Sequence, residues 1–122
     1  MIRVVRLGTP RAKGEGLRLG TVRRPPRGVK KTDYARLDYY DVWLPDLAPS
    51  QKVIALAHQD WKRFTRAYQR EMNAPAAQRL LGVLAALSRQ TDFSVGCYCE
   101  DEQRCHRSIL RQLLEQHGAR TS

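Results

Sequence analysis

The stretch FSVGCYCEDEQRCHRSILRQLLEQHG, residues 93–118, predicts a buried strand, a short polar loop and a helix in succession. The apolar run at 93–99 has the length and composition of a strand, and apolar residues recur at helical spacing over 106–118. Gly118 stands where a glycine commonly ends a helix. All three cysteines of the chain and one of its three histidines lie within residues 97–106. The stretch therefore predicts a candidate site at a strand–helix junction as well as part of the fold.

Two further strands are expected near the N-terminus, at 2–7 and 17–22, because both segments are apolar or alternate between apolar and polar residues. The segment RRPPRGVKK at 23–31 is expected to be a basic loop, since its two prolines lack backbone donors and its glycine permits a turn. A short strand is expected within 38–47, and Ser50 gives a start signal for a short helix.

Two longer helices are expected in the middle of the chain. Asp60 is a suitable N-cap for a helix with an aromatic stripe at helical spacing. The stripe consists of Trp61, Phe64, Tyr68 and Met72. We expect it to pack this helix against the sheet. Pro75 suits the first turn of the next helix, whose segment 80–87 is apolar nearly all round and is therefore expected to be buried.

The order of these elements predicts one α/β domain over residues 1–122, with a mostly parallel sheet flanked by helices in a Rossmann-like layering. A chain of 122 residues can bury a core without disulfides or metals. No apolar run approaches the roughly 20 residues of a membrane span, and the N-terminal segment lacks the features of a secretory signal. We therefore expect a cytoplasmic protein without a membrane partner, whose cysteines are more often thiols than disulfides.

The net charge of +10 is unevenly distributed. Residues 1–36 hold eleven Lys and Arg against only Glu15 and Asp33, whereas residues 37–122 hold eleven against ten acidic residues. Two interpretations remain open. The basic residues form a solvated surface, or they bind an anionic ligand, either a phosphate-bearing small molecule or a nucleic acid.

The cysteine-rich segment has several interpretations. Cys97, Cys99, Cys105 and His106 are zinc-ligand types, but structural zinc sites usually draw ligand pairs from two separated segments, and here one short segment supplies all four. We therefore expect no metal and no cofactor. A disulfide between Cys105 and either strand cysteine is sterically conceivable and would respond to redox conditions. Inert buried thiols are a further interpretation of Cys97 and Cys99.

We favour an anion site at this junction. Ligands of open α/β sheets gather where strands end and helices begin, and N–H groups at a helix start attract negative charge. The expected anion-binding residues are Arg23, Arg27, Lys30, Lys31, Arg107 and Ser108. The same field favours the thiolate of Cys105, which with His106 is the candidate catalytic pair. From Cys99 the next arginine is Arg104, which is one position too close for the C-x5-R spacing of phosphatases, so no phosphocysteine mechanism is predicted at Cys99.

Several motifs resemble the YeaO-like branch of the domain-of-unknown-function 488 family. The basic loop resembles the pattern R-x-x-x-R-G-[IV]-K-K through Arg23, Arg27, Gly28, Lys30 and Lys31. WLPDLAPS resembles W-x-K-E-L-A-P-S, and WKRFTRAYQREM resembles W-x-x-F-x-x-x-Y-x-x-E-[LM]. CYCEDEQRCHRS is closer to the wider family's C-x-E-x5-C-H-R-S. The resemblance covers most of the chain and implies a compact α/β fold with two converging polar segments, but no particular reaction.

The sequence also departs from that family at two places. Val22, Arg24 and Pro25 stand where the usual loop has Asp, Leu and Trp, and Cys99 stands where the wider family has Glu. If either acidic residue serves in acid–base chemistry, this chain lacks it.

Two function classes follow, and the sequence leaves open whether the protein is an enzyme. An enzyme would bind an anionic substrate between the loop 23–31 and the helix start, with Cys105 or His106 in the chemistry. The alternative is a non-catalytic module that binds nucleic acid through the same loop. Accessible aromatic residues after the loop, namely Tyr34, Tyr39 and Tyr40, would favour nucleic acid, whereas a deep pocket joining the loop to Cys105 would favour a small molecule.

Overall fold

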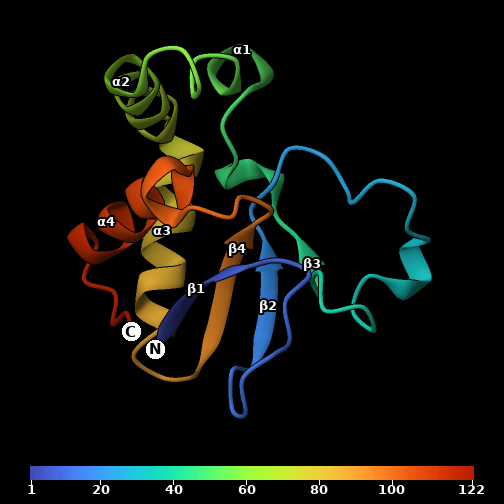
Figure 1. Cartoon of the computed structure of the whole chain (residues 1–122). Coiled ribbons are helices and arrows are strands. Elements are labelled where there is room, and N and C mark those ends of the chain that lie inside the picture. Colours follow the sequence, from blue (N-terminus) through green and yellow to red (C-terminus); the bar gives the residue numbers. More distant parts are fainter.

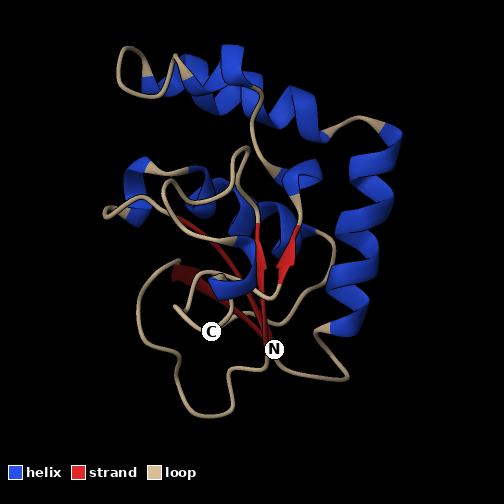
Figure 2. Ribbon diagram, turned by 90° about the vertical axis from the view of Figure 1, so that its right-hand side faces the viewer, coloured by secondary structure: helices blue, strands red, loops and turns tan.

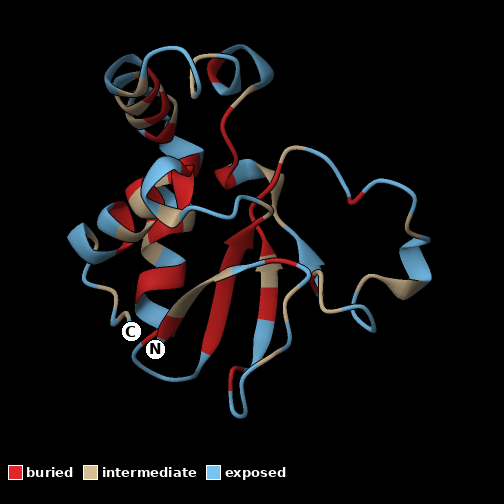
Figure 3. Ribbon diagram, viewed as in Figure 1, coloured by how far each residue is buried: buried red, intermediate tan, exposed pale blue.

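Four parallel strands form one sheet in the order β1–β4–β2–β3 in a computed structural model that describes all residues 1–122 (Figure 1). The strands are β1 (Ile2–Arg6), β2 (Leu17–Gly20), β3 (Val42–Trp43) and β4 (Phe93–Cys97). The central strand β4 pairs with β1 on one side and β2 on the other, and it is buried along its whole length (Figure 3). The α/β class and the parallel sheet predicted from the sequence are confirmed.

The helices follow the expected start signals. They are α1 (Gln51–Ile54), α2 (Trp61–Met72), α3 (Pro75–Leu87) and α4 (His106–Gln116), and 3-10 turns lie at Lys31–Asp33, Pro45–Leu47 and Glu102–Arg104. Ser50 caps α1 by accepting from the Val53 N–H, and Asp60 caps α2 by accepting from the Arg63 N–H. None of the helices is long and apolar enough to span a membrane.

The aromatic stripe of α2 is buried at Phe64, Tyr68 and Met72. However, α2 packs mainly against α1, α3 and α4, and it lies beyond the ends of the strands (Figure 1). The stripe belongs to the same hydrophobic core as Ile2, Phe93 and Val95 of the sheet, although helices rather than strands are the main neighbours of α2. The Tyr68 hydroxyl donates to the Leu47 carbonyl at 2.7 Å, which ties α2 to the chain entering α1.

The helix α3 is less buried than its composition predicts. Leu81, Leu84 and Ala85 are in the core, but the side chains of Val83 and Leu87 are 54% and 45% exposed. The reason is geometric, because a helix at the outside of the domain presents one face to its neighbours and the other to solvent.

Loops cover the face of the sheet opposite the main core, as the view along the sheet shows (Figure 2). The ring of Tyr40 lies so close to Gly20 that a Cβ atom there would meet it at 2.3 Å. Beside it, Arg18 and Glu15 form an ion pair at 2.8 Å with both side chains at least 97% buried. Burial alone would raise the pKa of Glu15, but hydrogen bonds from Arg18, Ser94 and the backbone outweigh it and bring the pKa to about 2.

The topology brings two segments to one end of the sheet. Because β2 and β4 are parallel neighbours, the chain leaves both strands at the same edge. The loop that begins with Thr21–Arg24 and the segment from Tyr98 to His106 therefore lie together there.

Candidate functional site

A cavity of about 530 Å³ lies between the start of the basic loop, the α1 region and the junction of β4 with α4. Its lining is mainly apolar, with cationic side chains among it. The residues that carry its polar chemistry are Arg23, Arg24, His58, Cys97, Cys99, Arg104, Cys105 and His106. The cavity thus joins the two segments that the sequence singles out.

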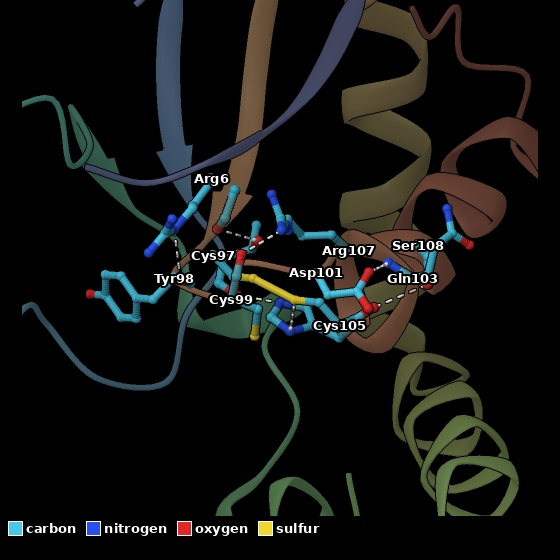
Figure 4. The surroundings of a disulfide bond; sticks show 12 residues. Arg6, Cys97, Tyr98, Cys99, Asp101, Gln103, Cys105, Arg107 and Ser108 are labelled. Atoms are coloured by element: carbon cyan, nitrogen blue, oxygen red, sulfur yellow. Dashed lines mark hydrogen bonds between the residues drawn. A yellow bond between two sulfur atoms is a disulfide. The ribbon is translucent and has the colours of Figure 1, made fainter. Parts of the chain in front are cut away.

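The three cysteines meet at this cavity. Their sulfur atoms lie within 4.8 Å of one another, and those of Cys97 and Cys105 form a disulfide (Figure 4). Cys97 and Cys105 are buried, whereas Cys99 is exposed and free. Partial burial raises the pKa of the Cys99 thiol, although the positive charges of Arg107 and Arg6 oppose the shift. As thiolates the three sulfurs are also the groups that would hold a soft metal ion, and the absence of a metal stays a prediction.

The imidazole of His106 is buried and held in one orientation. Its Nε2 lies 2.7 Å from the Thr21 carbonyl oxygen, which can only accept, so Nε2 carries a proton. In the neutral ring Nδ1 is then unprotonated, and it lies 3.8 Å from the Cys105 sulfur. Burial lowers the pKa of His106 to about 4, and the charge of Arg107 adds to this effect. The ring is therefore neutral at pH 7 and able to accept a proton at Nδ1.

Arg107 and Ser108 donate hydrogen bonds to the backbone of the segment that joins β4 to α4. Arg107 is buried and donates to the Cys99 carbonyl at 2.6 Å, while its Nε has no partner. The Ser108 hydroxyl donates to the Cys105 carbonyl at 3.0 Å. Neither residue lines the cavity, so the structure places both expected anion ligands where they brace the backbone around Cys99 and Cys105.

The basic loop divides into two parts. Arg23 lines the cavity, and its guanidinium donates to the carbonyls of Ala48 and Pro49. Arg27 lines an adjoining hollow of about 610 Å³ with Tyr39 and Tyr98, and this hollow shares Arg24 and Tyr98 with the cavity. Lys30 and Lys31 are exposed and line neither the cavity nor this hollow. Of the expected anion residues, only Arg23 shares the cavity with Cys105 and His106.

Two cationic residues of the cavity were not predicted as ligands. Arg24 is exposed at the rim and contacts the side-chain amide of Gln51. Arg104 is also exposed, and its guanidinium carbon lies 6.0 Å from the centre of the Trp61 ring. The only signal in the sequence was position, since Arg24 follows Arg23 and Arg104 precedes Cys105.

Part of the basic excess has a structural role. Four of the eleven basic residues in 1–36 pair with carboxylates, in the pairs Arg6–Glu100, Arg11–Asp41, Arg18–Glu15 and Arg36–Asp33. The cavity draws on Arg23 and Arg24, which are not among them. Of the eleven basic residues in 1–36, only these two line the cavity, so the net charge of this segment does not measure the charge of the site.

Comparison with protein families gives one match, to a family model described as the active DUF488-N3 subclade, over residues 2–118. The chain belongs to the DUF488 family. The resemblance in the basic loop and the cysteine segment is thereby confirmed at the level of the family. Membership of the YeaO-like branch stays a prediction. No curated protein and no solved structure matches significantly.

Proposed function

We propose that this DUF488 member is an enzyme that binds a phosphate-bearing small molecule in the cavity and acts on it with Cys105 and His106. The observation that supports this most is the single cavity shared by the basic loop and the Cys105–His106 pair. Concave sites of several hundred Å³ with an apolar lining and a few convergent polar groups are typical of small-molecule sites.

The cationic groups suit an anion at the rim. Arg24 and Arg104 come from the two segments that meet at the cavity, and both are exposed, so a phosphate can reach their guanidinium groups. The apolar lining, which includes Ile54 and Phe64, suits the organic part of the ligand. We therefore expect an ester of phosphate with an apolar or aromatic group to bind more tightly than inorganic phosphate.

The pair Cys105–His106 supplies the reactive groups in the reduced protein. In this proposal the Cys105 thiol passes its proton to Nδ1 of His106, which lies 3.8 Å from the sulfur. The thiolate then forms a bond to an electrophilic atom of the ligand, and the group that leaves this atom takes up the proton from His106. A base with a pKa of about 4 is weak at pH 7. A bound anion would raise the pKa of His106, because a negative charge nearby favours the imidazolium. Ligand binding and base strength are thereby coupled.

A thermal-shift screen of the reduced protein tests the binding step, with nucleotides, sugar phosphates, phenyl phosphate and short oligonucleotides as ligands. We expect phosphate-bearing small molecules to raise the Tm. Arg24→Ala and Arg104→Ala should each weaken binding by about tenfold or more, since a charge-assisted hydrogen bond contributes about 1.5–3 kcal/mol. Arg63→Ala is the matched control, because Arg63 is exposed on α2 and is not part of the cavity lining. Equal binding by all three variants would contradict the proposal.

A second candidate function, a nucleic-acid-binding module using the loop 23–31, rests on a different observation. Arg24 and Arg27 line the adjoining hollow with Tyr39 and Tyr98, a combination of cations and aromatic rings that suits single-stranded nucleic acid. This candidate predicts that oligonucleotides raise the Tm more than small phosphates do. It also predicts that Arg27→Ala, and not Arg104→Ala, removes the effect.

A further inference from the structure

The three cysteines differ sharply in access to solvent, although their sulfur atoms lie within 4.8 Å of one another. Cys97 and Cys105 are each 2% exposed, whereas Cys99 is exposed at the mouth of the cavity. A reagent of the size of a small peptide therefore reaches Cys99 first. From Cys99 the other two sulfurs are within reach of a short side-chain rotation (Figure 4).

We propose that this cluster exchanges thiols and disulfides with low-molecular-weight disulfides, with Cys99 as the entry thiol and the Cys97–Cys105 disulfide as the oxidised product. This activity goes beyond the proposed function, because it requires no bound phosphate and no turnover of the cavity's ligand.

The exchange balances in three steps. First, the Cys99 thiolate attacks a small disulfide, forms a mixed disulfide and releases one small thiolate, which takes up a proton. Second, Cys105 attacks the Cys99 sulfur and expels the second small thiolate, which takes up the Cys105 proton by way of Nδ1 of His106 and leaves as a thiol. Third, Cys97 attacks the Cys105 sulfur, which forms the Cys97–Cys105 bond and returns Cys99 as a free thiol. Two protein thiols and one small disulfide become one protein disulfide and two small thiols.

Three contacts support this sequence of steps. The Cys99 carbonyl accepts from the buried Arg107 at 2.6 Å, which holds the entry residue beside the other two cysteines. His106 presents its unprotonated nitrogen to Cys105 at 3.8 Å. The Cα atoms of Cys97 and Cys105 are 7.9 Å apart, which is beyond the usual range of disulfides, so the fold accommodates the two residues as separate thiols and closing the bond requires the backbone to move.

The reduced full-length protein is mixed with oxidised glutathione, quenched at intervals with an alkylating agent and analysed by peptide mass spectrometry. We expect a transient glutathione adduct on Cys99, followed by the Cys97–Cys105 bond. Cys99→Ser should reach the same bond at least about tenfold more slowly, because its remaining thiols are buried. In the double variant Cys97→Ser/Cys105→Ser the adduct on Cys99 should persist, because no second protein thiol remains to displace the glutathione. Thermal melts of the reduced variants check that each is folded.

Arg63→Ala is the matched control and should exchange at the wild-type rate, because Arg63 is exposed on α2 and belongs neither to the sulfur cluster nor to the cavity lining. The inference is overturned if Cys99→Ser oxidises as fast as the wild type or if the first adduct forms on Cys97 or Cys105. It is also overturned if a bound metal ion protects all three thiols until a chelator is added. Failure of exchange leaves the phosphate-binding screen unaffected, so the two proposals are tested separately.

Discussion

His106 is a residue whose environment sets its protonation state. Its ring is enclosed between Tyr68 of α2, Arg107 and Cys105, and its Nε2–H donates to the Thr21 carbonyl. Burial disfavours the charged form, which lowers the pKa to about 4 from an ordinary value of 6.5. Between about pH 6.5 and pH 4, His106 is therefore mostly protonated in the unfolded chain and mostly neutral in the folded protein.

This shift predicts a loss of stability between pH 6.5 and pH 4. Above pH 6.5 the histidine is neutral in both states, whereas below it the unfolded state binds more protons, so the free energy of unfolding falls as the pH falls. The contribution is about 3 kcal/mol at 1.4 kcal/mol per pH unit. Urea denaturation across this range should show it in the wild type and not in His106→Gln. Parallel pH profiles for the two proteins would contradict the assignment.

At Arg18 a buried charge depends on a single carboxylate partner. Removing one member of a buried ion pair leaves the other uncompensated, so Arg18→Leu should lower the free energy of unfolding by about 3–5 kcal/mol at pH 7. The exposed pair Arg36–Asp33 is the matched control, and Arg36→Leu should cost less than about 1 kcal/mol. Denaturant melts measure both. A similar small loss in both variants would show that the Glu15 carboxylate is not isolated from solvent.

The buried aromatic face of α2 contributes to the stability of the core. Phe64 is 2% exposed and stacks on Tyr68, with ring centres 6.1 Å apart. Phe64→Ala should therefore cost about 3–5 kcal/mol in denaturant melts. Arg66→Ala on the exposed face of the same helix should cost little. A loss below about 1 kcal/mol in Phe64→Ala would mean that the stripe faces solvent.

The elements themselves were predictable where the local signals were strong. Ser50 and Asp60 are N-caps in the structure, so α1 and α2 begin where the sequence predicts. The apolar period of α2 also predicted its buried face. The partners of α2 were not predictable, because periodicity identifies a buried face without identifying what covers it. Arg107 lies outside the cavity lining for a reason visible in the sequence. Arg107, Leu110 and Leu114 share helical spacing on one face of α4, and all three are buried.

For the whole molecule, the sequence predicted which segments meet but not which side chains do. The loops that follow two adjacent parallel strands begin at the same end of the sheet. Because β2 and β4 are such neighbours, Arg23 lies in one cavity with Cys105 and His106. Strand order does not predict the path of a loop beyond the strand end. Lys30 and Lys31 lie beyond the prolines and line no part of the cavity, whereas Arg24 and Arg104 reach its rim.

In the function we propose, one cavity, bounded by the basic loop and the start of α4, binds a phosphate-bearing small molecule. The most direct measurement is an NMR titration of the uniformly 15N-labelled, reduced protein with phenyl phosphate, with inorganic phosphate and phenol as comparisons. We expect phenyl phosphate to bind most tightly of the three ligands. The amide chemical-shift changes should concentrate in Val22–Arg24, Gln51–His58 and Arg104–His106. Changes confined to Arg27–Lys31, or scattered over exposed arginines with equal affinity for inorganic phosphate, would contradict it.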